Sequence, residues 1–187
     1  MIFRPMHSDD LVAVSELGIR SKSTWGYPKS AMAVFAKELT HGPELIANSF
    51  AAIVACVGSQ ITGYFTLVRR DDDTIELDFM FVSPEFIGQG FGTAMMLEVI
   101  RLAVSHDAER LTLTADPNAV GFYQRFGAEI VGEHQSSIPN RTIPMMEIAL
   151  ASVGHTSELC YDGVTNRFVS CHDGNCDGPQ DSSSSRR

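Results

Sequence analysis

The sequence predicts a mixed α/β fold, with helices flanking a sheet that is neither all parallel nor all antiparallel. Three observations lead to this prediction. Two helical segments follow a short opening strand, three strand-like segments then come in succession, and helices and strands alternate after them. The predicted order of elements is β-α-α-β-β-β-α-β-α-β-β.

The first elements are marked by helix start and stop signals. An opening strand is expected over 1–4. A helix is expected to begin at Ser8, and the helix dipole favours the two aspartates in its first turn. Gly26 and Pro28 interrupt the helical pattern, and a second helix is expected over 29–40.

The central and C-terminal elements follow from apolar runs and turn residues. Gly58-Ser59-Gln60 separates two apolar runs and predicts a hairpin. Ser83 and Pro84 end the third strand of the series. The elements expected here are strands over 50–57, 61–69 and 75–82, a helix over 93–105, a strand over 111–115, a helix over 118–127, and strands over 128–135 and 142–150.

Composition divides the 187 residues near residue 150. The first part has clear apolar periods, whereas the second is polar and rich in glycine, serine and aspartate. Such a segment cannot bury enough apolar surface to offset the entropy lost on ordering. We therefore predict one domain over 1–150 and a polar, disordered tail over 151–187.

Charge and hydropathy restrict the partners. The formal net charge is -9, which disfavours a basic surface for nucleic acid. The longest apolar run, 50–57, is far shorter than the roughly 20 residues that a membrane span needs, and no signal peptide is recognised. We expect a cytoplasmic protein that binds neither nucleic acid nor membrane.

Three of the four cysteines lie in the predicted tail. Cys160, Cys171 and Cys176, with His155 and His172, raise the question of zinc, but their spacing is irregular for a zinc site. A disulfide is disfavoured in the cytoplasm. We expect no metal and no catalytic role for this segment.

A glycine-rich turn is the most informative stretch for function. Gly88, Gly90 and Gly92 lie between a predicted strand and a helix, where backbone N–H groups and the helix N-terminus can approach an anion. No Gly-Lys pair is present, so this is not a P-loop. Thr93 and Met95 occupy the positions where a dinucleotide fingerprint needs its third glycine. A pyrophosphate cradle of another kind, or a loop without a ligand, remains.

Two motifs resemble those of the GNAT family of N-acetyltransferases. Phe81-Val82-Ser83-Pro84, followed by Gly90-Phe91-Gly92, is similar to the family's pyrophosphate motif. The stretch 118–128, Asn-Ala-Val-Gly-Phe-Tyr-Gln-Arg-Phe-Gly-Ala, resembles its second motif. The two occur in the family's order, and the resemblance covers about 1–150. One departure is Ile87, where the family usually has arginine or glutamine.

The resemblance implies a GNAT-like fold with a partly splayed sheet and acetyl-CoA as acetyl donor. The segment 20–27 is also similar to uncharacterised members, without implying a substrate. The expected acetyl-CoA-binding residues are Met80, Phe81, Val82, Ile87, Gly88, Gln89, Gly90, Phe91, Gly92, Thr93, Asn118, Phe122 and Tyr123. Core packing is an alternative role for the Met80 and Phe81 side chains, and helix capping is one for Asn118.

Three residues are candidates for catalysis. The resemblance implies that Tyr123 protonates the departing CoA thiolate, and the alternative is a packed tyrosine on an amphipathic helix. An attacking amine must be neutral, although a lysine-like amine has a pKa of about 10.4. Glu76 and Asp78 alternate on one predicted strand and would share a face, which makes either a candidate base, with Glu76 slightly favoured. Alternatively, they are solvated or pair with Arg69 or Arg70.

The acceptor side is less well defined. Trp25 and Tyr27 are expected near the acceptor amine, where they would suit a cation, although core filling is an equal alternative. Arg141 would meet an acidic acceptor group or lie in water. The expected function is acetyl transfer from acetyl-CoA to an amine of a small molecule or peptide by direct attack in a ternary complex, in a possible homodimer. The alternative is a non-catalytic acyl-CoA-binding regulatory module.

Overall fold

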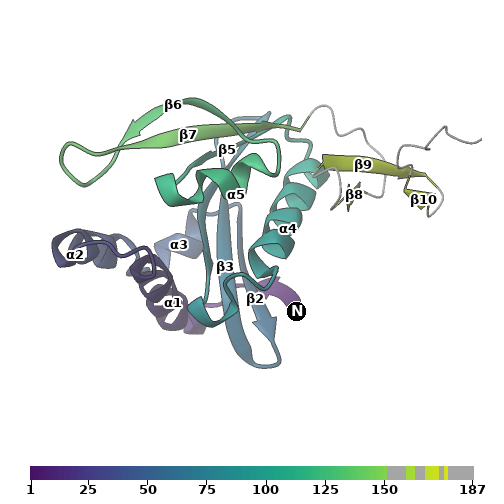
Figure 1. The fold of residues 1–187 in the computed structure, drawn as a ribbon. Coiled ribbons are helices and arrows are strands. Elements are labelled where there is room, and N and C mark those ends of the chain that lie inside the picture. The colour runs from purple at the N-terminus through teal and green to yellow at the C-terminus, as the bar shows by residue number, and fades with distance from the viewer. Residues whose placement is uncertain (151–158, 163–166, 173–174, 177–187) are drawn as a thin grey trace, which may run out of the picture.

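Seven strands form one mixed sheet in the order β1-β2-β3-β4-β5-β7-β6 (Figure 1). The computed structural model describes residues 1–150, 159–162, 167–172 and 175–176. The strands of this sheet are β1 Ile2–Pro5, β2 Ala51–Val57, β3 Gln60–Arg69, β4 Thr74–Val82, β5 Arg110–Thr114, β6 Glu129–Gln135 and β7 Thr142–Ala149. Only β4 and β5 are parallel among its neighbouring pairs. The predicted mixed sheet is confirmed.

Helices cover both faces of the sheet. The main ones are α1 Leu11–Ser23, α2 Lys29–Glu38, α4 Phe91–Ser105 and α5 Val120–Gln124. Tyr64 and Phe65 are consecutive in β3, so their side chains point to opposite faces. Tyr64 packs in a cluster with residues of α1, and Phe65 packs in a cluster with residues of α4. The two helices therefore lie on opposite faces, as Figure 1 shows.

An apolar stripe on α4 fixes the position of the glycine-rich turn that precedes it. The stripe recurs at helical spacing and is almost fully buried: Met95, Met96, Val99, Ile100 and Ala103. It packs against sheet residues that include Phe65, Leu67 and Ile75. The stripe belongs to the largest apolar cluster of the described residues, and its packing holds the N-terminus of α4 beside β4.

The structure differs from the predicted elements in several places, two of which lie between α2 and β6. An additional short helix, α3 Glu44–Ala47, lies before β2. The helix predicted over 118–127 begins as a 3₁₀ turn, Pro117–Ala119, and continues as α5. Asp116 caps this turn by accepting a hydrogen bond from the backbone N–H of Asn118, so the capping role considered for Asn118 was wrong.

The C-terminal segment is only partly described. β8 Leu159–Asp162, β9 Arg167–His172 and β10 Asn175–Cys176 form a separate antiparallel sheet in the order β10-β9-β8. The rest of the predicted tail lies outside the described residues, as do the side chains on which a zinc site would depend. Where the chain is described, no helix is both long and apolar enough to cross a membrane.

Candidate active site

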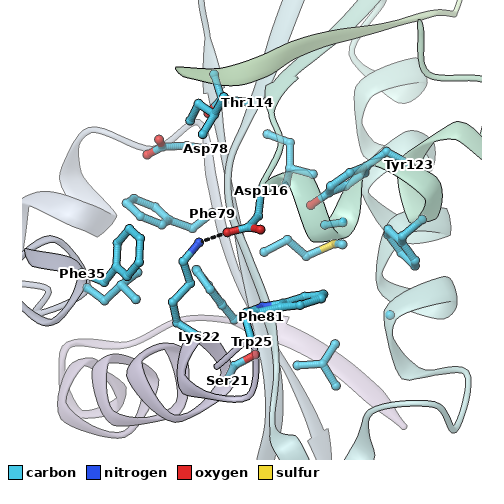
Figure 2. A pocket seen from close by; sticks show the side chains of 18 of the residues that line it. Ser21, Lys22, Trp25, Phe35, Asp78, Phe79, Phe81, Thr114, Asp116 and Tyr123 are labelled. Carbon is cyan, nitrogen blue, oxygen red and sulfur yellow. Dashed lines mark hydrogen bonds and ion pairs between the residues drawn. The ribbon is translucent and has the colours of Figure 1, made fainter. Parts of the chain in front are cut away.

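A cavity of about 700 Å³ lies where β4 and β5 separate. Its walls come from α1, α2, β4, the glycine-rich turn, α5 and the β6–β7 hairpin (Figure 2). The elements therefore bring together side chains that are far apart in the sequence, including Lys22, Asp78 and Tyr123.

The separation of β4 and β5 creates an open strand edge inside the cavity. The parallel pairing ends at Leu77 and Leu113, yet β4 continues to Val82. β5 ends at Thr114, after which the chain turns away toward α5. Backbone groups of β4 beyond Leu77 thus have no β5 partner on that side and can bond an extended, amide-containing ligand as an added strand would.

The glycine-rich turn presents backbone N–H groups at the other end of the cavity. Gly88 and Gly90 have φ angles of 79° and 84°, which disfavour any side chain. A Cβ at Gly92 would lie 3.3 Å from the ring of Phe122, so the turn and α5 approach closely there. The first intrahelical N–H bond runs from Ala94 to Gly90, at 3.0 Å, which leaves the preceding N–H groups of α4 for an anion.

Contacts outside the cavity hold this turn in place. The Gln89 side chain donates to the backbone oxygen of Glu85 at 2.7 Å, and the rings of Phe86 and Phe91 pack 4.7 Å apart. Glu85 in turn pairs with Arg20 at 2.6 Å. Gln89 and Phe91 therefore stabilise the turn, whereas Ile87, Gly88, Gly90, Gly92 and Thr93 line the cavity.

Tyr123 lies on α5 with its hydroxyl pointing into the cavity (Figure 2). Its side chain is buried, and its ring meets that of Phe122 edge to face at 5.1 Å. Burial raises the pKa of the Tyr123 hydroxyl well above its usual range, and the negative charge of Asp116 raises it further. The phenol is therefore a protonated donor at neutral pH.

The two candidate carboxylates of β4 have different surroundings. A β-bulge lies opposite Thr66 and Leu67 of β3, whose partners are Phe79 and Leu77, so Asp78 is the extra residue. Asp78 lines the cavity, whereas Glu76 accepts a hydrogen bond from Arg70 at 2.6 Å and is not a lining residue. The predicted alternative of a pair with Arg70 thus applies to Glu76.

The environment of Asp78 favours its use as a base. Asp78 is solvent-exposed, but partial desolvation by the surrounding protein raises the pKa of its carboxyl above its ordinary value; the charge of Glu76 adds to this effect, while Arg70 lowers it. A carboxylate with a raised pKa binds a proton more readily than an ordinary one does. Glu76 therefore acts on Asp78 through its charge.

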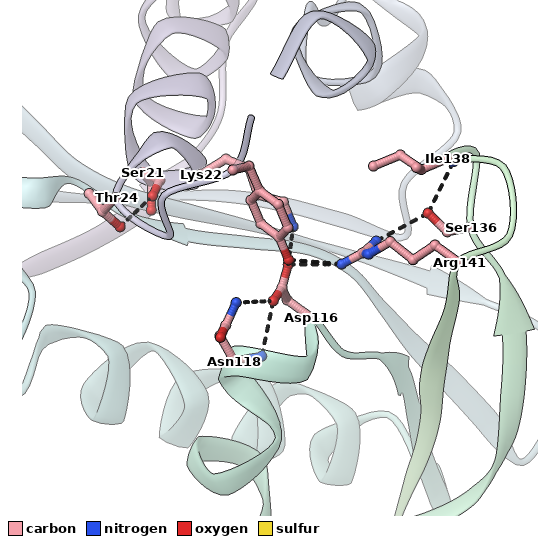
Figure 3. Close-up of polar contacts among 9 residues, drawn as sticks. Ser21, Lys22, Thr24, Asp116, Asn118, Ser136, Ile138 and Arg141 are labelled. Carbon is pink, nitrogen blue, oxygen red and sulfur yellow. Dashed lines mark hydrogen bonds and ion pairs between the residues drawn. The ribbon is translucent and has the colours of Figure 1, made fainter. Parts of the chain in front are cut away.

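A half-buried ionic cluster forms one wall of the cavity (Figure 3). Lys22 of α1 pairs with Asp116 at 2.5 Å, and Tyr27 donates its hydroxyl proton to the same carboxylate at 2.7 Å. Arg141, from the β6–β7 hairpin, donates to the Tyr27 hydroxyl at 2.9 Å and lies 3.4 Å from Asp116. Asn118 binds the other Asp116 oxygen through its amide and backbone.

The ionic cluster keeps Asp116 ionised. Burial alone would raise the pKa of its carboxyl, but hydrogen bonds from Lys22 and Tyr27 outweigh burial and hold the pKa below its ordinary value. The cluster joins α1, the α1–α2 loop, the end of β5 and the last hairpin. Asp116 also caps the turn that leads into α5, so the cluster positions Tyr123 relative to the opposite wall.

The structure places most predicted site residues at the cavity but not all. Met80, Phe81, Val82, Phe122 and Trp25 line it with those already named. Tyr27 and Asn118 lie behind the wall as partners of Asp116. Lining residues that the sequence did not indicate include Lys22, Phe35, Glu38, Thr114, Asp116, Arg125, His134, Ser136 and Ser137. Helical spacing places Lys22 on α1, but nothing local signals its partner at residue 116.

The cavity offers backbone groups of the kinds that coenzyme A would need. Gly88 and Gly90 have backbone angles that keep side chains off the turn, and exposed N–H groups suit a pyrophosphate. The open edge of β4 suits the amides of a pantetheine arm. Among residues 1–150, no group of three or more histidine, cysteine or acidic side chains is arranged to hold a metal ion.

A splayed mixed sheet with a glycine-rich turn before α4 and a tyrosine on α5 defines the GNAT class of acetyltransferases. The sequence matches the Acetyltransferase (GNAT) family over residues 15–128. The chain belongs to this family.

Several curated relatives are N-acetyltransferases by name. An uncharacterized N-acetyltransferase of Mycobacterium tuberculosis is 32% identical over 85 residues, which cover 44% of this chain and 54% of the relative. GCN5-related N-acetyltransferase 2, chloroplastic, of Arabidopsis thaliana is 38% identical over 50 residues, covering 27% of this chain and 19% of that protein. The chain thus spans between about a fifth and about half of these relatives' length.

Solved structures share the fold at low sequence identity. A GCN5-related N-acetyltransferase from Rhodopseudomonas palustris has a TM-score of 0.69 and 19% identity, covering 80% of this chain and 95% of that chain. The PaiA N-acetyltransferase of Thermoplasma acidophilum, solved in complex with coenzyme A, has a TM-score of 0.65 and 18% identity, with 79% and 98% covered. The predicted family and fold are confirmed.

Proposed function

We propose that this chain transfers the acetyl group of acetyl-CoA to a neutral amine by direct attack in a ternary complex. The observation that carries the proposal is that Tyr123 and Asp78 line one cavity, between a glycine-rich turn and an open strand edge. The described residues that line the cavity lie within 1–150, the part of the chain to which we assign the activity. The coenzyme A bound to the Thermoplasma acidophilum relative supports the choice of donor.

The donor site follows from the backbone. The N–H groups of the turn and of the first turn of α4 would hold the pyrophosphate, and the edge of β4 from Asp78 to Val82 would bond the pantetheine amides. The bound donor supplies an activated thioester. Ile87 is half-exposed and lines the cavity, where its side chain would pack against the donor in place of the usual polar side chain.

Acid and base functions fall to two side chains on different elements. Asp78 accepts the proton of the acceptor ammonium, directly or through water, so that the amine can attack the thioester carbonyl carbon. As the new C–N bond forms, the C–S bond breaks and its electron pair leaves with sulfur, and the nitrogen loses its second proton to solvent. Tyr123 donates its phenolic proton to that sulfur and is reprotonated from solvent. Glu76 keeps Asp78 basic through its charge.

Binding and turnover can be measured separately. Calorimetric titration of acetyl-CoA into the protein tests the donor site, and release of free CoA thiol in the presence of an amine panel tests transfer. Binding with thiol release above the uncatalysed rate is expected. Binding without release on any amine would favour the alternative, a non-catalytic acyl-CoA-binding regulatory module. Absence of acetyl-CoA binding would overturn both.

A further inference from the structure

The ionic cluster on the cavity wall contains more positive than negative charge. Lys22 and Arg141 both contact Asp116, whose carboxylate is the only anionic partner that either cation has among residues 1–150. Their side chains are only 13% and 19% exposed, and that of Asp116 is 9% exposed. Two cations that share one carboxylate leave a net charge of about +1 in a partly desolvated wall, which is costly without a further anion.

Asp116 cannot neutralise the remaining positive charge of the cluster. Its Oδ2 already meets Lys22, Tyr27 and Arg141, and its Oδ1 accepts both hydrogen bonds from Asn118. The lone pairs of this carboxylate are therefore fully used.

Donors on the two cations remain unused. The Lys22 ammonium has three N–H donors, and its hydrogen bond to Asp116 takes one of them. Arg141 uses Nη1 toward Ser136 and Nη2 toward Tyr27 and Asp116, while its Nε has no acceptor within residues 1–150. Aromatic faces of Tyr27 and Phe35 lie beside both cations and offset part of the lost hydration. Both cations line the cavity, so their free donors can meet a ligand there.

The opposite sign of charge lies elsewhere on the same cavity wall. Asp78 and Glu38 line the cavity, and neither forms an ion pair within residues 1–150. Figure 2 shows Asp78 on a different part of the wall from the Lys22–Asp116 pair. One region therefore favours an ammonium group, and another favours a carboxylate.

We propose that the acceptor is a small amine that carries a carboxylate, with the carboxylate bound by Lys22 and Arg141 and the amine delivered to Asp78. This inference rests on the proposed acetyl transfer and specifies its substrate class. Arginine and lysine donors form strong, charge-assisted hydrogen bonds with a carboxylate, and the bound anion neutralises the surplus charge of the wall. An amino acid or a short peptide with a free C-terminus satisfies both regions.

Matched amines test the proposal on the unaltered protein. Thiol release is measured at saturating acetyl-CoA with three sets of amines. Lysine is compared with cadaverine, phenylalanine with phenethylamine and with phenylalanine methyl ester, and glycyl-glycine with glycyl-glycine amide. The carboxylate form is expected to have a kcat/KM about tenfold or more above its partner. Preference for the dipeptide over single amino acids would identify a peptide C-terminus, and the reverse preference would identify a free amino acid.

Variants assign the effect to the two cations. Arg141→Gln and Lys22→Met should each raise the KM for the carboxylate acceptor about tenfold. The ratio of kcat/KM for the carboxylate acceptor to kcat/KM for the decarboxylated amine should fall toward one, and the acetyl-CoA Kd should not change. Arg101→Gln, on the exposed face of α4 where it pairs with Glu98, is the matched control and should change neither.

Three outcomes would overturn the proposal. Equal acetylation of amines with and without a carboxylate would remove the carboxylate subsite while leaving acetyl transfer intact. Weaker acetyl-CoA binding in Arg141→Gln, with an unchanged acceptor KM, would assign the cations to the donor instead. Acetyl-CoA binding without thiol release from any amine would refute the transfer itself, and the substrate class with it.

Discussion

Tyr123 combines burial with access to the cavity, and this combination decides its protonation. Burial and the charge of Asp116 raise the pKa of its hydroxyl, so the proton that it would donate is retained throughout the physiological range. An ordinary tyrosine has a pKa of about 10. Deprotonation of Tyr123 should therefore not lower the rate of acetyl transfer as the pH rises to about 10.

Replacing Tyr123 with phenylalanine should lower kcat about 100-fold, because a positioned general acid contributes at least that much. The acetyl-CoA Kd should stay unchanged, since the ring still packs against Phe122. Thiol-release kinetics and calorimetry measure the two quantities. Tyr64→Phe, which removes a buried hydroxyl from the core beside His41, is the control and should keep its kcat. An unchanged kcat in Tyr123→Phe would exclude it as the acid.

Variants of Asp78 and Glu76 should differ in how their activity depends on pH. A base works only when ionised, so activity should be present above the raised pKa of Asp78 and be lost as the pH falls through it. Asp78→Asn should lower kcat/KM about 10- to 100-fold at neutral pH and remove this acidic limb. Glu76→Gln should retain activity and move the limb to lower pH, because the charge that raises the Asp78 pKa is gone. The opposite ranking would assign the base to Glu76.

At the scale of elements, the turn and α4 act as one unit. The apolar stripe of α4 fixes the helix axis, and the turn then presents N–H groups at a defined place. The bulge in β4 has a comparable local effect. It inserts Asp78 into the strand at the point where β5 departs, and so brings a carboxylate to the cavity.

Gly90→Glu should abolish acetyl-CoA binding, measured by calorimetry, because it adds a side chain and a negative charge where the pyrophosphate would lie. Gly58→Glu is a matched control: Gly58 also has a positive φ, 59° against 84°, but lies in the β2–β3 turn and does not line the cavity. Backbone strain is therefore present in both variants. If both bind acetyl-CoA as the unaltered protein does, the turn is not the phosphate site.

Across the whole molecule, Asp116 connects the cavity wall that contains Lys22 and Arg141 to α5. It links α1, the α1–α2 loop and the last hairpin, and it also caps the turn before α5. Separate parts of the fold thus share one carboxylate, and its loss should loosen their arrangement as well as the cavity.

Asp116→Asn should lower the free energy of unfolding by about 2 kcal/mol at pH 7, since charged hydrogen bonds are lost and two cations are left without an anion. The pKa of Asp116 is depressed in the folded state, so its contribution is complete above the unfolded-state pKa of about 3.9 and is lost as the pH falls through the folded value. Denaturant unfolding from pH 7 to pH 3 should show the difference from the variant shrinking below about pH 4.

Asp9→Asn, at an exposed position near the start of α1, serves as the control for this measurement and should change stability little. A difference between Asp116→Asn and the unaltered protein that stays constant with pH would contradict the assigned ionisation of Asp116.

By itself the sequence determined the family, the order of the main elements, the glycine-rich turn and the tyrosine of α5. These depend on local patterns, since periodicity, turn residues and short motifs lie within a few positions of one another. The spacing of Glu76 and Asp78 likewise identified both as candidates, but regular alternation could not show which of them reaches the cavity.

Only the tertiary structure decided how these parts form a site. Lys22, Asp116 and Arg141 are 94 and 25 positions apart, and no local pattern pairs them. The bulge that distinguishes Asp78 from Glu76 arises from pairing with β3, and the sequence of β4 alone does not reveal that pairing. Tyr27, expected beside the acceptor, became a partner of Asp116 because α1 and the last hairpin converge there. Long-range packing sets such contacts, and with them the charge of the cavity wall.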